Sequence, residues 1–242
     1  MTSIKLDILV LAVHPDDAEL GCSGTILKQK ALGHKVGIVD FTVGELGTRG
    51  SGELRLVESA DAAKVMNLDI RENLGFRDGF FKNDEEHQLK IIEKIRKYRP
   101  EILIINAPED RHPDHGRAGA LATEAAFYSG LRKVETTDED GNAQNEWRPK
   151  QIFQYIQDRY LEPDFVIDIT EYWDKKVEAI KAFKSQFYDP NSPEPQSYIS
   201  SADFFDFVEA RAREMGHKIG ATYGEGFMKT KTIGVSQLFD IK

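Results

Sequence analysis

Two short motifs combine histidine with aspartate, and each follows an apolar run with the character of a buried strand. HPDD occupies residues 14–17, directly after the run 8–13, and HPDH occupies residues 112–115, soon after the run 101–107. Imidazole and carboxylate groups are ligands of Zn²⁺, and three protein ligands with one open position are the pattern of a catalytic zinc site. Of the two adjacent acids in the first motif, one can bind the metal while the other accepts a proton from water. The two motifs together predict a metal-dependent hydrolase.

Each motif taken alone also has a structural interpretation. Asp16 and Asp17 suit the N-cap and the first turn of a helix, where the helix dipole favours negative charge. A structural zinc site, however, has no open position. Here the two motifs offer more groups than three ligands require, and the extra acid Asp16 and the extra histidine His112 would be available for catalysis. The pair of motifs therefore favours a catalytic metal site over a structural or regulatory one.

The elements that must position these motifs alternate between strand-like and helix-like patterns. Apolar runs predict strands over 6–13, 36–42, 73–76, 101–107, 151–157 and 165–169. Helical spacing predicts helices over 16–32, 53–66, 85–98, 116–131, 171–187 and 202–215. This alternation predicts an α/β fold, a Rossmann-like and mostly parallel sheet covered by helices. Ligands bind at the carboxyl ends of the strands in such sheets, and both motifs follow strand ends.

The segment 135–148 is polar and contains glycine and asparagine, so we expect an exposed loop or hairpin and a candidate boundary. The three prolines of 189–196 predict a further loop. No internal repeat divides the chain. We therefore expect one domain over 1–242, with a βα core that carries the metal site in 1–134 and a C-terminal elaboration of the same domain in 149–242.

Composition limits the classes of partner. The chain has 242 residues, 40% of them hydrophobic, and a formal net charge of -9, which argues against a nucleic-acid partner because phosphate binding needs a basic face. The run 8–13 is too short to span a bilayer. Cys22 is the single cysteine and cannot form an intrachain disulfide. We expect a cytoplasmic protein with no membrane partner, in which Cys22 is a small buried residue.

The glycine-rich segment 44–52 follows the second predicted strand. It contains neither GxGxxG nor GxxxxGK[ST], so it is predicted to be a substrate-binding loop rather than a phosphate loop. Arg49 and Arg55 lie in or beside this segment, and Arg111 precedes the second histidine motif. The guanidinium fork fits a carboxylate. Together these arginines predict a site for an anionic group of the substrate, and the alternative for each one singly is a surface or structural ion pair.

The residues around the two motifs give a specific resemblance. AVHPDDAELGCSGT at 12–25 and RHPDHGRAG at 111–119 resemble the LmbE/PIG-L family of zinc-dependent N-acetylglucosaminyl deacetylases. GELGTRGSGELR at 44–55 and IGATYGEGF at 219–227 are most similar to the members of bacillithiol biosynthesis. The order of predicted strands and helices is similar over most of the chain.

The resemblance implies one Zn²⁺ per chain, with other divalent metals possible, held by His14, Asp17 and His115. Asp16 matches the general base that activates the zinc-bound water. Once protonated, it supplies the proton that the departing amine needs. The resemblance thus assigns the two roles predicted for the adjacent acids, with Asp17 as the ligand and Asp16 as the base.

The resemblance also implies roles outside the ligand set. His112 matches the imidazolium that stabilises the oxyanion, and Asp114 matches the carboxylate that orients and charges this imidazolium. Glu45 and Arg55 match positions that contact substrate, and Arg49 joins them on its charge. These five residues complete the site that the sequence predicts.

The implied substrate is a small-molecule amino-sugar conjugate, N-acetylglucosaminyl-L-malate, which loses its acetyl group. Alternatives within the same chemistry are a deacetylase of another N-acetylglucosamine derivative and a thiol-conjugate amidase. A non-enzymatic alternative is a Rossmann-like nucleotide-binding module, against which the missing dinucleotide fingerprint argues. The resemblance further implies a homo-oligomer, either a trimer or a hexamer.

Overall fold

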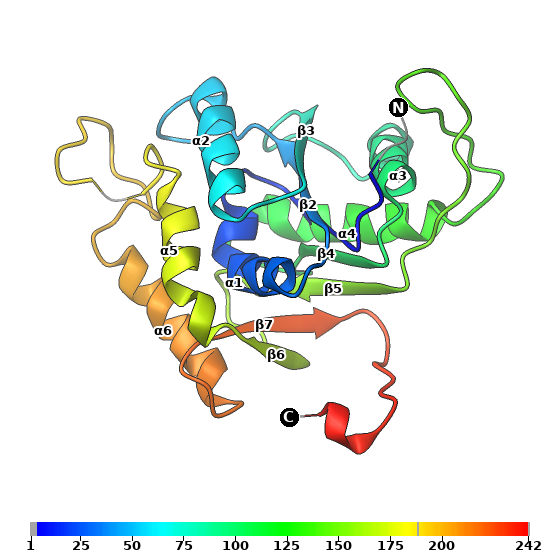
Figure 1. The fold of residues 1–242 in the computed structure, drawn as a ribbon. Helices are drawn as coiled ribbons and strands as arrows, with labels where there is room; N and C mark the ends of the chain where they lie inside the picture. Colours follow the sequence, from blue (N-terminus) through cyan, green and yellow to red (C-terminus); the bar gives the residue numbers. More distant parts are fainter. Residues whose placement is uncertain (1–3, 188, 242) are drawn as a thin grey trace.

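Seven strands form one sheet in a computed structural model that describes residues 4–187 and 189–241 (Figure 1). The strands are β1 (Ile8–Ala12), β2 (Val36–Thr42), β3 (Ile70–Phe76), β4 (Ile102–Asn106), β5 (Gln151–Tyr155), β6 (Phe165–Asp168) and β7 (Gly224–Lys229). Their order in the sheet is β3-β2-β1-β4-β5-β7-β6. The strands from β3 to β5 pair in parallel, and β7 runs antiparallel to both of its neighbours. The predicted α/β class with a mostly parallel sheet is confirmed.

Helices cover both faces of the sheet. They are α1 (Asp17–Ala31), α2 (Gly52–Val65), α3 (Glu85–Tyr98), α4 (Pro113–Tyr128), α5 (Trp173–Lys181) and α6 (Phe204–His217), with 3-10 turns η1 (Thr170–Tyr172) and η2 (Leu238–Asp240). Leu9 and Leu11 of β1 join the core under α3 and α4, whereas Ile8 and Val10 join the core under α1, α2, α5 and α6. Burial on both faces explains why β1 is a continuous apolar run.

The site is set by the position of β1 and β4 at the centre of the sheet. These strands are hydrogen-bonded neighbours, with Leu11 level with Ile105. From β1 the chain proceeds to β2 on one side of the sheet, and β4 lies on the other side. The following helices, α1 and α4, cover opposite faces. A crevice opens where the strand order reverses in this way, at the carboxyl ends of β1 and β4.

Strand β7 was not predicted, because glycines interrupt its apolar pattern. Helix α6 packs so closely on this strand that a Cβ at Gly226 would lie 2.9 Å from the Met215 sulfur. At Gly224 a Cβ would lie 2.6 Å from the Cγ1 of Val166 on the neighbouring strand. Close packing therefore requires glycine at these two positions, although glycine in a sequence usually suggests a turn. Strand β7 contains residues 224–227 of the segment 219–227 and continues to Lys229.

Three predicted elements have other bounds in the structure, and one of them, α4, spans Pro113–Tyr128 instead of 116–131. Strand β3 begins at Ile70, three residues before the predicted start. Helix α5 ends at Lys181 instead of continuing to residue 187. Glu58 of α2 accepts hydrogen bonds from the amide and the hydroxyl of Ser185, at 2.7 and 2.8 Å. These contacts hold the chain after α5 in a turn directed at the crevice.

The polar segment 135–148 is a hairpin at the opposite end of the sheet. Thr137 and Ala143 form an isolated bridge, and the indole of Trp147 donates to the carbonyl of Pro100 just before β4. Strand β5 follows the hairpin and pairs directly with β4, so one sheet continues across this segment. Among the residues that the structure describes, no helix has the length and apolarity needed to cross a bilayer.

Candidate metal centre and active site

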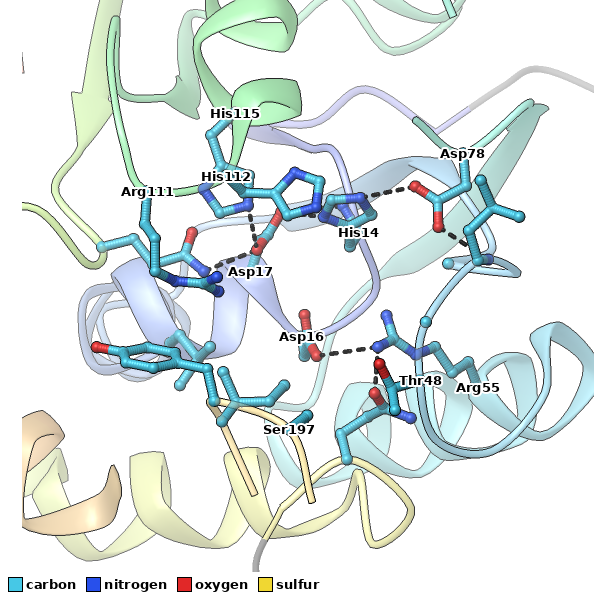
Figure 2. A pocket seen from close by; sticks show the side chains of 18 of the residues that line it. His14, Asp16, Asp17, Thr48, Arg55, Asp78, Arg111, His112, His115 and Ser197 are labelled. Carbon is cyan, nitrogen blue, oxygen red and sulfur yellow. Dashed lines mark hydrogen bonds and ion pairs between the residues drawn. The ribbon is translucent and has the colours of Figure 1, made fainter. Parts of the chain in front are cut away.

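A pocket of about 430 Å³ lies at the carboxyl ends of β1 and β4. Several of the residues predicted from the sequence line it, namely His14, Asp16, Asp17, Arg55, Arg111, His112 and His115. Figure 2 shows the three imidazoles on one side of the pocket, with Asp16 and Arg55 across from them. The two histidine motifs therefore meet, although they are about a hundred residues apart in the sequence.

The turn between β1 and α1 positions the first motif. Asp17 begins α1, and its Oδ2 accepts the backbone N–H of His14 at 2.9 Å and lies 3.4 Å from the Nδ1 of His14. Asp16 has φ 121° and ψ -22°, a conformation that L-residues rarely adopt and that is concentrated at functional sites. The turn thus separates two adjacent carboxylates, because Asp17 faces the histidine while Asp16 faces Arg55.

The start of α4 positions the second motif. His112 is the N-cap residue and Pro113 occupies the first helical position, where the missing N–H costs nothing. The N–H of His115 donates to the carbonyl of His112 at 3.1 Å. Both imidazoles contact the ring of His14, with centroids 4.8 Å apart for His112 and 5.7 Å apart for His115.

Two of the three separations among the predicted ligands are close to those of zinc ligands, and each involves a different oxygen of Asp17. Asp17 Oδ1 lies 3.2 Å from His115 Nε2, and Asp17 Oδ2 lies 3.4 Å from His14 Nδ1. Ligands about 2.1 Å from a tetrahedral ion are about 3.4 Å apart. Among the described residues, two sets of side chains could hold a cation, His14 with His112 and His115, and His14 with Asp78 and Asp114. Asp17 belongs to neither set but contacts both His14 and His115.

Two acids that were not predicted from the sequence contact the two histidines predicted as ligands. Asp110 Oδ2 lies 2.7 Å from His115 Nδ1, and Asp78 Oδ1 lies 3.0 Å from His14 Nε2. Each contact occupies the ring nitrogen that faces away from Asp17. Metal-binding histidines typically donate their other N–H to a carboxylate in this way, which fixes the tautomer. Both acids follow the carboxyl end of a strand, and this position could have identified them.

The electrostatics of the centre favour a positive charge between these groups. Burial alone would lower the pKa of His14, but hydrogen bonds to Asp114 and Asp17 raise it well above the usual value. Burial likewise opposes the charge on His115, yet Asp17 and Asp110 raise its pKa to about 9. Burial opposes ionisation of Asp17, but His115 and His14 hold its pKa well below the usual value. A donor set of this charge fits a divalent cation.

Asp16 has the environment of a general base. It is 4% exposed, and burial, with the nearby charge of Asp17, raises its pKa to about 7 against the opposing charge of Arg55. The Arg55 guanidinium lies 3.8 Å from Asp16 Oδ2 and also bonds to Gln186. Gly44 allows this approach, since φ is 67° there and a Cβ would overlap the Arg55 guanidinium.

The expected pairing of Asp114 with His112 is wrong. The Asp114 carboxylate accepts from the N–H of Gly79 and from Arg117, both at 2.9 Å, and lies 3.6 Å from His14 Nε2. Only its backbone N–H reaches His112, donating to Nδ1 at 3.3 Å. An Nδ1 that accepts leaves the proton of a neutral ring on Nε2. Burial and the charges of the neighbouring histidines lower the pKa of His112, which favours a neutral ring over the expected imidazolium.

Of the residues expected to contact substrate, some line the pocket and others do not. Arg55 lines the pocket, but Glu45 and Arg49 are not among the lining residues. The Glu45 carboxylate accepts the backbone N–H of Asp78 at 2.8 Å, so it supports the loop that holds His14. Arg49 is buried, and its carbonyl accepts from Gln186 at 2.8 Å. Spacing alone could not distinguish a loop side chain that faces the pocket from one that faces the protein.

The C-terminal third closes the pocket, and sequence reasoning identified none of its contributions. Gln157 follows β5 and donates to Asp17 Oδ1 at 2.7 Å, and residues 197–199 form part of the wall. The Arg111 guanidinium lies 4.3 Å from the ring centre of Tyr198. Cys22 is buried as expected, and His217 is exposed at the end of α6 and is not among the lining residues.

Comparison with known proteins agrees with this geometry. Residues 9–126 match the family described as PIG-L, GlcNAc-PI de-N-acetylase. The diacetylchitobiose deacetylase of Thermococcus kodakarensis is 29% identical over 191 residues, covering 74% of this chain and 70% of the relative. The probable N-acetyl-alpha-D-glucosaminyl L-malate deacetylase 2 of Bacillus subtilis is 29% identical over 201 residues, covering 76% of this chain and 84% of the relative.

A crystal structure extends the similarity to the whole fold. A conserved protein of Thermus thermophilus is 35% identical and superposes with a TM-score of 0.83. The similarity covers 96% of this chain and 98% of that one. The elaborated C-terminal third is therefore shared as well as the βα core.

Proposed function

Since the chain belongs to the GlcNAc-PI de-N-acetylase (PIG-L) family, we propose that its pocket hydrolyses the acetamide of an N-acetylglucosamine conjugate with one metal ion held by His14, Asp17 and His115. One observation carries the proposal. The Asp17 carboxylate lies between two imidazoles, with one oxygen 3.4 Å from His14 Nδ1 and the other 3.2 Å from His115 Nε2, beside a second buried acid, Asp16, that faces Arg55.

The metal's contribution is limited to Lewis-acid activation. Zn²⁺ held by these three residues would activate a water molecule and polarise the acetyl carbonyl. Asp78 and Asp110 would keep the ring nitrogens of the two histidines directed at the ion. The donor set is one carboxylate and two imidazoles, which leaves a position open as in catalytic zinc sites.

Two residues of the chain would then move or hold protons. Asp16, with a pKa near 7, takes a proton from water and returns it to the departing amine nitrogen, the two tasks that amide hydrolysis requires. His112 donates from Nε2 to the carbonyl oxygen as negative charge develops there, because its Nδ1 is already occupied by the Asp114 amide. Arg55 holds the Asp16 carboxylate in place through the 3.8 Å contact.

For the substrate we propose N-acetylglucosaminyl-L-malate. The Bacillus subtilis relative, named for that reaction, supports this choice. So does the Arg111 side chain, which lines the pocket and remains 43% exposed although Asp158 is 3.7 Å away. A partly exposed guanidinium at the pocket can bind a carboxylate. Diacetylchitobiose, the substrate named for the Thermococcus relative, has no carboxylate to offer it.

An acetate-release assay tests both levels of the proposal. Purified protein is given N-acetylglucosaminyl-L-malate, diacetylchitobiose or free N-acetylglucosamine, each with and without a chelator. We expect chelator-sensitive acetate release, fastest with the malate conjugate. No release from any of the three would contradict the deacetylase, and preference for diacetylchitobiose would contradict the malate assignment alone.

An Arg111→Gln variant sharpens the substrate assignment. We expect KM for the malate conjugate to rise about tenfold, the loss of one charge-assisted hydrogen bond of about 1.4 kcal/mol. KM for free N-acetylglucosamine should stay within about twofold. Equal changes for both substrates would indicate that Arg111 does not contact the malate carboxylates.

A further inference from the structure

Helix α1, which begins with Asp17, is broken one turn later. Cys22 has φ -148° and ψ 15°, outside the helical range, so an upstream segment 17–21 is joined to a downstream segment 23–31 through a kink. The downstream segment is anchored in the core through Ile26. The direction of the upstream segment, and with it the position of Asp17, depends on what holds the break.

A buried ion pair lies against this break. Lys176 of α5 and Glu225 of β7 are 2% and 4% exposed, and Lys176 Nζ lies 2.6 Å from Glu225 Oε1. Both residues come from the C-terminal third, and Glu225 belongs to the GEG of the segment 219–227. Neither lines the active-site pocket.

The ion pair bridges two backbone groups on opposite sides of the break. In a continuous helix the carbonyl of Leu20 accepts from the N–H of Gly24. Here Lys176 Nζ donates to the Leu20 carbonyl at 2.8 Å, and the Gly24 N–H donates to Glu225 Oε1 at 2.9 Å. A side-chain pair inserted in this way into the hydrogen-bond ladder is a recognised cause of a sharp kink.

The signs of the two charges match the two helix ends that the break creates. The ammonium of Lys176 meets carbonyls at the end of the upstream segment, since it also donates to the Glu19 carbonyl at 3.2 Å. The carboxylate of Glu225 meets amides at the start of the downstream segment, including Thr25 N–H at 2.7 Å. Cations are favoured at helix C-termini and anions at N-termini.

We propose that Lys176 and Glu225 are positioning residues, which cap both sides of the break in α1 and thereby fix the turn that presents Asp17 to the metal. A buried ion pair adds little net stability, because desolvation offsets its attraction. Its contribution here is geometric. Lys176 holds the carbonyls two and three residues after Asp17, and Glu225 ties the downstream amides to the central sheet through β7.

Two neutral variants and a matched control test this role. Glu225→Gln removes the charge with little change of shape, and Lys176→Met removes the ammonium but keeps an apolar stem. Lys30→Met is the control, because Lys30 is also on α1 and makes an ion pair with Asp69 at 2.5 Å, but far from the break. The readouts are Zn²⁺ affinity by competition with a chromophoric chelator, and the visible absorption spectrum of the Co²⁺-loaded protein.

We expect both neutral variants to bind Zn²⁺ about tenfold more weakly, as changes outside the ligand shell commonly do, and to show an altered Co²⁺ spectrum. Lys30→Met should keep both properties. KM for substrate should change less than kcat, since neither residue lines the pocket. Unchanged Zn²⁺ affinity and Co²⁺ spectrum in the neutral variants would overturn the proposal, whatever their thermal stability.

A charge-swapped variant, Lys176→Glu with Glu225→Lys, separates capping from simple ion pairing. It keeps two opposite charges but places the carboxylate at carbonyls and the ammonium at amides. We expect no recovery of Zn²⁺ affinity relative to the single variants. Recovery to the wild-type value would show that only the pairing matters and would overturn the capping role.

The proposal rests on the metal site of the proposed function. Hydrogen exchange distinguishes a failure of the capping role from a failure of the proposed function. In the metal-free protein, amides 18–21 should exchange faster in Glu225→Gln, while those of α3 should not change. If the wild-type chain binds no Zn²⁺ but this exchange increases, the proposed function fails and the capping role stands. If Zn²⁺ binds and neither exchange nor affinity changes, the capping role alone fails.

Discussion

At the scale of single residues, the two adjacent acids of the first motif have different partners. Asp17 contacts two imidazoles, whereas Asp16 is buried beside Arg55. For Asp16→Asn we expect about one Zn²⁺ per chain, as in the wild type, and turnover lowered at least about a hundredfold, because the base is lost while the ligands remain. Metal content and acetate release measure the two effects. Asp61→Asn, an exposed acid paired with Lys64, is the control. Near-normal turnover in Asp16→Asn would refute the base assignment.

The two acids behind the histidines give a second residue-scale prediction. For Asp110→Asn we expect Zn²⁺ affinity about 10–100-fold weaker, because the carboxylate that fixes the His115 ring is lost. Chelator competition measures it. Asp158→Asn is a matched control, since Asp158 lies near Arg111 and not beside a ligand histidine. Equal affinity in Asp110→Asn and wild type would mean that His115 is held without this contact.

At the scale of elements, an acid on β3 links the strand to α3. Lys94 Nζ lies 2.7 Å from Glu72 Oε2, and Lys97 Nζ lies 2.8 Å from Glu72 Oε1. Burial opposes ionisation of Glu72, but hydrogen bonds from Lys94, Lys97 and Tyr98 lower its pKa to about 2. The folded pKa lies below the unfolded one. The ionised form therefore stabilises the fold above pH ~4.5, and this contribution is lost as the pH falls towards 2.

Glu72→Gln should accordingly destabilise the protein only where Glu72 is ionised. We expect a loss of about 1 kcal/mol at pH 7, after discounting for solvent screening of a partly exposed group, and a smaller loss at about pH 3. Urea unfolding at both pH values measures it. Glu86→Gln, on the exposed face of α3, should change stability at neither pH. A pH-independent loss would indicate a packing defect instead.

Sequence patterns predicted the elements that have a regular pattern of buried residues and clear signals at their ends. Strand β1 is apolar on both faces, and α3 matched its predicted ends because Asp84 caps its start and Arg99 adopts a left-handed conformation at its end. Strand β7 escaped prediction because close packing on α6 demands glycine. Likewise, the two histidine motifs supplied the candidate metal ligands, which remain a prediction, whereas Asp78 and Gln157 reach the site only through the tertiary fold. The homo-oligomer stays a prediction.

At the scale of the whole molecule, the proposed metal would link distant parts of the fold, because its proposed ligands lie in the turn between β1 and α1, at the start of α1 and near the start of α4, and the two helices cover opposite faces of the sheet. Zn²⁺ that binds only the folded chain, at about a hundred times its Kd, adds about 2.7 kcal/mol of stability. For a chain of this length we expect a Tm increase of about 5–10 °C. Thermal scans with and without chelator measure it, and His115→Ala should abolish the difference. An equal Tm increase in His115→Ala would place the stabilising ion elsewhere.

The hairpin 135–148 lies at the end of the sheet that faces away from the pocket, near Pro100 and the start of β4. Its tip is closed by hydrogen bonds between Asp138 and Asn142, and the residues between them are exposed. A peptide tag or a surface linker inserted after Asp140 should therefore leave kcat and KM unchanged. The same chain attached to a solid support through this tip would present its pocket to the solution. The hairpin is therefore a suitable attachment site for immobilising the protein.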